Sequence, residues 1–144
     1  MGDEQDGLLG RRTMALAGLL MGMSPWVAWA QTPFASSAER SSSERGVTVK
    51  VTAKSVGQPG IPWEFAVVLD AHSADLNDDL TQSATLTTED GRTFKPTGWV
   101  GAPPGGHHRE GVLVFEVQAP RPGVIELRID RPGESAPRTF RWQL

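Results

Sequence analysis

The chain has 144 residues, a formal net charge of −3 at pH 7 and no cysteine. A near-neutral balance of interspersed charges gives no basis for nucleic-acid binding, and the absence of cysteine excludes disulfides and thiolate metal ligands. All 4 methionines lie within residues 1–30, so the rest of the chain offers no thioether ligand for Cu(I).

Residues 1–30 have the three parts of a secretory signal peptide. Arg11 and Arg12 precede an apolar run over residues 14–23, and Ala28-Trp29-Ala30 follows as a small-residue cleavage site. The run is shorter than the roughly 20 residues of a spanning helix, and an uncleaved anchor is the alternative. The paired arginines are compatible with the twin-arginine export route. We predict a periplasmic or secreted bacterial protein with no membrane span after signal cleavage.

After the signal peptide, the sequence predicts a flexible linker followed by one domain. Residues 31–45 are rich in serine and carry almost no apolar pattern, which is typical of a flexible segment. Residues 46–144 change to a period of two, and no segment in this range has the periodicity of a helix. The domain is long enough to bury a core without disulfides.

About seven short strands are expected in this domain, and the second is apolar on both faces, which predicts a central position. The expected strands cover residues 47–53, 63–69, 80–86, 94–99, 112–117, 124–129 and 140–144. Asp90-Gly91 predicts a hairpin, and Pro96 indicates an edge strand or a bulge. The pattern predicts an all-β, immunoglobulin-like antiparallel β-sandwich of about seven strands, with a small barrel as the alternative.

Reversal of the chain at each strand places alternate loops at the same end of such a sandwich. One end, called the histidine end below, collects the loops 70–79, 101–109 and 131–137. The opposite end collects the loops 54–61, 88–91 and 118–122. All 3 histidines of the chain therefore fall at the histidine end.

Imidazoles and carboxylates gathered at one end suit a divalent ion such as Cu(II), Zn(II) or Ni(II). We predict His72, His107 and His108 as ligands, Asp75 as a fourth ligand, and Arg109 as a brace behind them. Adjacent histidines in a regular strand point to opposite faces, but the two glycines before them permit an irregular backbone. The competing interpretation is structural: the histidines hold the loops by hydrogen bonds, and Arg109 pairs with a loop aspartate.

Catalysis is not predicted. The chain has no nucleophile elbow, phosphate-binding glycine loop or zinc-protease motif, and Ser73 beside His72 does not make a triad. The neighbouring Asp78 and Asp79 are more typical of a turn than of acid–base chemistry. We therefore predict a non-catalytic binding module for a metal ion. The alternative is a protein-interaction or assembly module of the cell envelope, with structural histidines and an envelope protein as its partner.

Two segments carry a resemblance to known proteins. The pattern D-x-H-S-x-D-L runs from Asp70 to Leu76, and G-G-H-H-R-x-G runs from Gly105 to Gly111. Together they resemble a group of small exported bacterial all-β domains without an assigned function, over about residues 46–144. In architecture the domain is also similar to periplasmic copper-handling sandwiches of the CopC type, whose Met-rich loops and N-terminal histidine are absent here.

Overall fold

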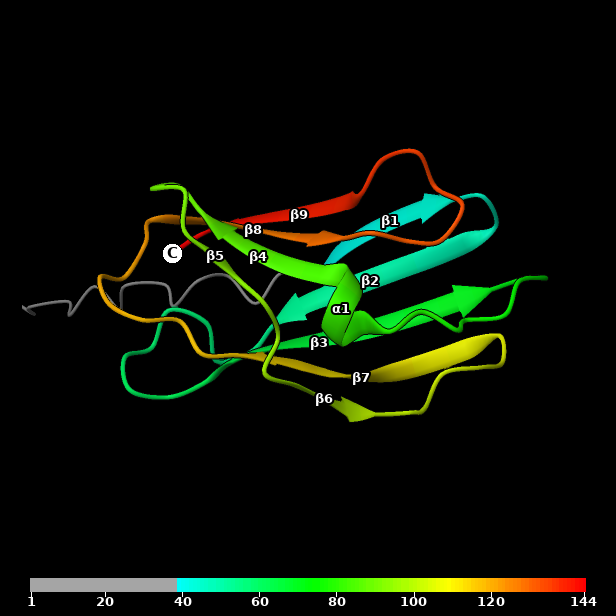
Figure 1. The fold of residues 1–144 in the computed structure, drawn as a ribbon, viewed down its shortest axis with the longest axis horizontal. Coiled ribbons are helices and arrows are strands. Elements are labelled where there is room, and N and C mark those ends of the chain that lie inside the picture. The colour runs from blue at the N-terminus through cyan, green and yellow to red at the C-terminus, as the bar shows by residue number, and fades with distance from the viewer. Residues whose placement is uncertain (1–38) are drawn as a thin grey trace, which may run out of the picture. The chain divides into compact units, whose positions relative to one another are not determined.

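The computed structural model describes residues 39–144, which form two antiparallel β-sheets packed as a sandwich (Figure 1). The expected signal peptide, residues 1–30, and residues 31–38 of the expected linker lie outside the described residues. The elements are β1 (Arg40–Glu44), β2 (Val47–Ala53), β3 (Trp63–Ala71), α1 (Leu80–Ser83), β4 (Ala84–Thr88), β5 (Thr93–Phe94), β6 (Gly98–Gly101), β7 (His108–Phe115), β8 (Val124–Ile129) and β9 (Arg138–Gln143). Among residues 39–144, no helix has the length and apolar character that crossing a membrane requires.

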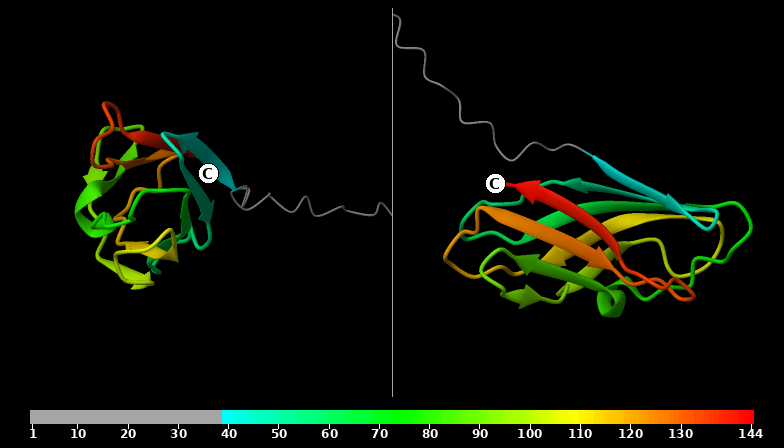
Figure 2. Two further views of the ribbon diagram at one scale, coloured as in Figure 1. Left: turned by 90° about the vertical axis from the view of Figure 1, so that its right-hand side faces the viewer. Right: turned by 90° about the horizontal axis from the view of Figure 1, so that it is seen from above.

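Each sheet is fully antiparallel. Sheet A has five strands in the order β1-β2-β3-β7-β6, and sheet B has four in the order β5-β4-β8-β9. The two layers can be followed from the end of the strands in Figure 2. The predicted all-β sandwich is confirmed, with more strands than the seven expected, and β3 holds the predicted central position between β2 and β7.

The core lies between the sheets and is built by strand alternation. Phe65 on β3 packs edge-on against Phe115, with ring centroids 5.7 Å apart. It also packs against the tilted ring of Trp142 from sheet B, with ring centroids 5.4 Å apart. Trp63 and Trp142 are buried, whereas Trp99 is only partly buried. Aromatic side chains from both sheets therefore join the two layers.

Strand β1 corrects the extent of the expected linker. Residues 40–44 have no apolar side chain, so the sequence pattern gives no sign of a strand, yet they pair with β2 along their whole length. The guanidinium of Arg138, at the start of β9, donates to the carbonyl oxygens of Ser42 and Glu44 at 2.9 Å each. The strand is therefore held by bonds to β2 and β9, and not by burial of its own side chains.

Two other elements differ from the expected strands. Residues 80–83 form the short helix α1, because Asp79 caps its first turn by accepting from the amide of Thr81 at 3.0 Å. The expected strand 94–99 divides at Pro96 into β5 of sheet B and β6 of sheet A. Proline has no N–H to give to a ladder, so the chain changes sheets there.

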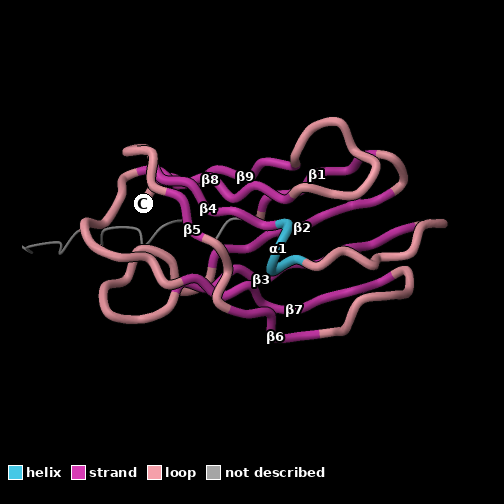
Figure 3. Tube along the Cα trace, viewed as in Figure 1, coloured by secondary structure: helices cyan, strands magenta, loops and turns pink. Residues whose placement is uncertain are grey.

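The loops gather at the two ends of the strands (Figure 3), and the predicted grouping is confirmed at the histidine end. The amide of Leu76 donates to the carbonyl oxygen of Gly106 at 3.0 Å, which joins the loops after β3 and after β6. Arg131, which follows β8, pairs with Asp78 at 2.7 Å. Segments far apart in sequence therefore meet here by chain reversal.

Candidate functional site

The four predicted metal ligands lie at the histidine end, where His107 and His108 have different hydrogen-bonding partners and, within the described part of the chain, the side chains of His72 and Asp75 have none. Nδ1 of His107 lies 3.0 Å from the carbonyl oxygen of Ala74, which only accepts, so this nitrogen carries a hydrogen and donates it. Nδ1 of His108 lies 2.5 Å from a carboxylate oxygen of Asp70 on the neighbouring strand. His72 and Asp75 are exposed, and within residues 39–144 their side chains have no hydrogen bond or ion pair.

These contacts do not assemble the predicted metal centre. Within residues 39–144, no group of three or more histidine, aspartate or glutamate side chains is arranged to hold a metal ion. His108 is the first residue of β7 and pairs with Asp70 in the ladder, so it follows regular strand alternation. His107 lies outside the strand and holds the loop through Ala74. His107 and His108 thus make the loop and strand contacts that the structural interpretation expects, and binding of Cu(II) or Zn(II) stays a prediction.

The pair of His108 with Asp70 is exposed on the outer face of sheet A. Its hydrogen bond to Asp70 raises the pKa of His108 above the ordinary value of 6.5, and the charge of Glu110 adds to the effect. The Nε2 atom of His108 lies 3.7 Å from a carboxylate oxygen of Glu110. This imidazole thus lies between two carboxylates that favour its protonated form.

Arg109 is buried behind the histidines, but it braces the main chain instead of a metal ligand or a loop carboxylate. Its guanidinium donates to the carbonyl oxygens of Asp78 at 2.5 Å and Ala102 at 3.1 Å. It also lies over the ring of Trp99, 5.1 Å from the centroid. A single cation therefore ties the loops after β3 and β6 to strand β7.

Two further buried arginines were not anticipated from the sequence. Arg131 pairs with Asp78 at 2.7 Å, and Arg138 pairs with Glu134 at 2.6 Å. The hydrogen bond from Arg138 is the main cause that lowers the pKa of Glu134 below its ordinary value. Arg138 lies two residues before the buried Phe140. Because side chains alternate between the two faces of a strand, this spacing is the sequence signal that Arg138 lies on the inner face of β9.

A cleft of about 360 Å³ opens at the histidine end between residues 74–78 and 131–134. Its floor includes Asp78, Arg131 and Glu134, whose charges are already paired with one another or with Arg138. Its lining has no serine, threonine, cysteine, lysine or histidine. The lining therefore offers no hydroxyl or thiol nucleophile and no histidine base, and its one carboxylate without a partner is that of Asp75.

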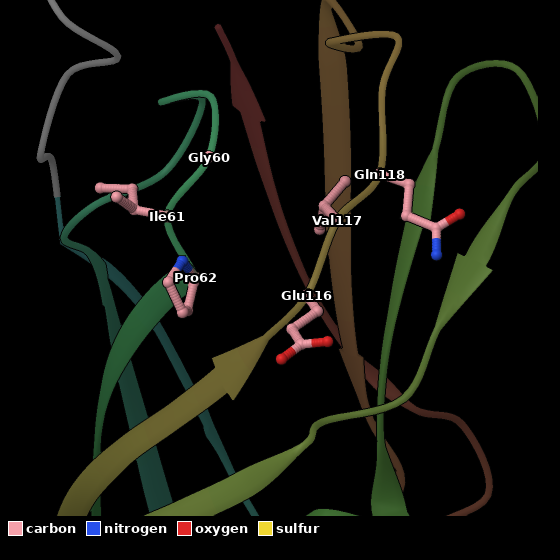
Figure 4. Close-up of a pocket in the computed structure, with 6 residues that line it drawn as sticks. All are labelled: Gly60, Ile61, Pro62, Glu116, Val117 and Gln118. Atoms are coloured by element: carbon pink, nitrogen blue, oxygen red, sulfur yellow. The ribbon is translucent and has the colours of Figure 1, made fainter.

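A second cavity, of about 220 Å³, lies at the opposite end (Figure 4). Ile61 and Pro62 line one side of it, and Glu116 and Val117 come from the segment that follows β7. Glu116 is the only titratable group in its lining, and no hydroxyl or thiol accompanies it. This cavity offers no catalytic set either.

The outer surface of sheet A has a different character. Outward side chains of β3, β7 and β6 form an apolar surface, called the valine face below, made of Ala66, Val68, Val112, Val114 and Val100. Val112 has Ala66 opposite it on β3 and Val100 opposite it on β6. Val100 is 68% exposed, the largest exposure of any large apolar side chain within residues 39–144.

The apolar character of both faces of β3 predicts a central strand, and β3 is central in sheet A. Its outer side chains Ala66 and Val68 are half-buried, and no described residue covers that side. The outer side of β3 is therefore part of an apolar surface that is open to solvent.

Strand β6 is the edge of sheet A next to the valine face (Figure 1). Ala102 donates to the carbonyl oxygen of Glu110 at 2.9 Å. Because bonded and non-bonded pairs alternate along an antiparallel ladder, the amides and carbonyls of Trp99 and Gly101 then point away from β7. Within residues 39–144 no strand lies beyond β6, so these groups form an open edge.

The other sheet edges within residues 39–144 are protected. Strand β5 has only two residues, and β1 and β9 face each other, with Arg40 donating to the carbonyl oxygen of Arg141 at 3.3 Å. Strand β6, by contrast, consists of Gly98, Trp99, Val100 and Gly101, without a charge or a proline. The four residues of β6 therefore carry none of the charges or prolines by which edge strands often avoid pairing with another chain.

Within residues 39–144, the fold is an all-β sandwich in which β6 is an open edge strand without a charged residue of its own. No protein-family model, curated protein or solved structure matches the chain.

Proposed function

We propose that this chain is an exported, non-catalytic protein-interaction module that binds an extended segment of an envelope protein beside strand β6. The single observation that carries the proposal is the open edge of β6, which is uncharged and exposes Val100. Edge strands of this kind pair readily with a strand from another chain.

Binding would extend sheet A by one strand. The partner's main chain would hydrogen-bond to the outward amides and carbonyls of Trp99 and Gly101. Its outward side chains would continue the row formed by Ala66, Val112 and Val100. Main-chain bonds would supply affinity, and side chains next to Val100 would supply specificity.

Three features of the chain support the other parts of the proposal. Export is supported by the basic, apolar and small-residue parts of residues 1–30. The non-catalytic role rests on the sequence, which has no nucleophile elbow, phosphate-binding glycine loop or zinc-protease motif. The two packed antiparallel sheets support the finer assignment to the immunoglobulin-like sandwiches.

The test is selection of short peptides from a displayed random library on the purified protein, followed by affinity measurement on variants. Val100→Lys places a charge on the β6 edge and should weaken selected peptides by about tenfold or more, which corresponds to about 1.4 kcal/mol. Gln143→Lys is the matched control, because Gln143 is an exposed residue of β9, the edge of sheet B.

Hydrogen exchange supplies an independent readout. Bound peptide should slow exchange at the amides of Trp99 and Gly101, which otherwise face solvent. The proposal is overturned if no peptide is recovered, or if the peptides bind wild type and Val100→Lys equally without protecting these two amides.

A further inference from the structure

We infer that the segment bound beside β6 carries a lysine or arginine two residues from an apolar side chain, so that the apolar residue lies beside Val100 and the cation lies near Glu110. The inference rests on the proposed function and names the chemistry of the partner. It follows from the charges around the open edge and from the spacing of side chains in strands.

The charges near β6 on the outer face of sheet A are predominantly acidic. Glu64, Asp70 and Glu110 lie on the outer sides of β3 and β7. No lysine or arginine accompanies them on the outer sides of β3, β7 or β6, and His108 is the only titratable base there. A basic partner would therefore meet attraction along this margin, and an acidic one would meet repulsion.

Within residues 39–144, no lysine or arginine forms an ion pair with Glu64, Asp70 or Glu110. Arg109 lies on the inner side of β7, with its guanidinium bound to main-chain carbonyls. The ammonium of Lys95, just before β6, donates to the carbonyl oxygen of Gln82 at 2.7 Å and is held against α1 and β4. Two lysines lie on the far side of β3 from the open edge. Lys50 on β2 is separated from Glu110 by Val68, and Lys54, just after β2, donates its amide to the carbonyl oxygen of Glu64 at 2.8 Å.

Glu110 is the acidic group best placed to contact an added strand. Its carboxylate-bearing side chain is 69% exposed, and its contact with His108 is long, at 3.7 Å. Glu110 lies two residues from Val112 on the same face of β7. Its neighbour on the side of the open edge is Ala102, which has a small side chain.

Strand geometry fixes the spacing of the partner's side chains. Residues two apart in a strand lie on the same face, about 6.6 Å apart. If one residue of the added strand lies beside Val100, the residue two positions along lies level with Ala102 and Glu110. A lysine or arginine there can lay its methylene groups over Ala102 and bring its charge to the carboxylate. The direction of the added strand does not change this spacing.

The test selects displayed peptides separately on wild type and on Glu110→Lys. Glu110 is exposed, so the charge reversal should leave the fold intact, which circular dichroism checks. Wild type should enrich lysine or arginine two positions from an apolar residue, and Glu110→Lys should enrich aspartate or glutamate at that position. Replacing the selected cation by glutamine should weaken binding to wild type by about threefold to fivefold at low salt. Glu126→Lys, on the outer side of β8 in sheet B, is the matched control and should select the same peptides as wild type.

The outcomes separate the two proposals. If wild type and Glu110→Lys enrich the same residues while Val100→Lys still abolishes binding, strand addition stands and the basic specificity is overturned. If no selected peptide depends on Val100, the proposed function fails and this inference fails with it. If both selections follow the charge at residue 110 and both depend on Val100, both proposals are supported.

Discussion

Replacing Arg138 by methionine tests whether the buried arginines hold the histidine end together. The side chain of Arg138 is fully buried and donates to both carboxylate oxygens of Glu134, at 2.6 and 2.9 Å. It also donates to the carbonyl oxygens of Ser42, Glu44 and Val47, each at 2.9 Å. Methionine keeps most of the side-chain length but removes every one of these donors.

The magnitude follows from what Arg138→Met leaves behind. The carboxylate of Glu134 stays buried, with only the 3.3 Å contact to Arg131. Removing one member of a buried ion pair costs about 3–5 kcal/mol of unfolding free energy, which should lower the melting temperature by more than about 10 °C in a domain of this size. The variant Glu134→Leu/Arg138→Met removes both charges and should recover part of the loss. The rest should remain, because the main-chain carbonyls of β1 stay unpaired.

Urea denaturation followed by tryptophan emission measures the unfolding free energy of the two variants and the wild type. The pKa of Glu134 is lowered in the folded protein, mainly by its hydrogen bond with Arg138. The Glu134–Arg138 pair therefore stabilises the fold at pH values above the ordinary pKa of 4.5, and this stabilisation is lost as the pH falls through the pKa of the folded protein. This acid dependence should shrink in Arg138→Met. Hydrogen exchange should quicken first in β1. A loss below about 1 kcal/mol, or a double variant no more stable than the single one, would refute the reasoning.

Two further predictions concern residues of strand β7. A Cβ atom at Gly111 would lie 2.5 Å from Cζ2 of Trp99, so Gly111→Ala should cost about 1–3 kcal/mol in urea denaturation. Gly98→Ala is the control, because its Cβ would meet nothing within 4 Å, and equal losses in both variants would contradict the explanation. Asp70→Asn should lower the pKa of His108, because the bond to Asp70 is the main cause that raises it. The exposed His108–Asp70 pair stabilises the folded state at low pH, and this stabilisation is lost as the pH rises through the pKa of His108 in the folded protein. Imidazole resonances in an NMR titration report the shift, and an unchanged pKa would show that Asp70 is not its cause.

The strands that the sequence predicts well are those whose burial is local and alternating. Residues 47–53 form β2 as expected, and every second side chain in it is buried. The grouping of loops at two ends is also predictable, because it depends only on the number of chain reversals. In both cases the information lies within a few neighbouring residues or in the order of the strands.

The missed elements depend on contacts between distant residues. Strand β1 has no apolar period of its own and is bound by Arg138, about 96 positions away in sequence. Helix α1 was hidden because Leu80, Ala84 and Leu86 suit a strand pattern, although the cap at Asp79 is a helix signal. Chain reversal brings His107 and His108 to one end, but it does not set the direction of each side chain. The strand register of His108 and the loop contact of His107 decide that direction and separate the two imidazoles.

The histidine end and strand β6 differ in the number of hydrogen-bonding groups that each leaves free for a partner. At the histidine end, a ligand that needs the guanidinium of Arg131 must displace Asp78 from a pair whose side chains are 6% and 3% exposed. Breaking such a buried pair costs about 3–5 kcal/mol before any new bond is counted. At β6, the outward amides of Trp99 and Gly101 face water, so a partner strand exchanges water for main-chain bonds and covers Val100 at the same time. On these magnitudes, we expect the proposed partner to bind at the open edge of sheet A, because the buried charged residues of the histidine end are already paired with one another.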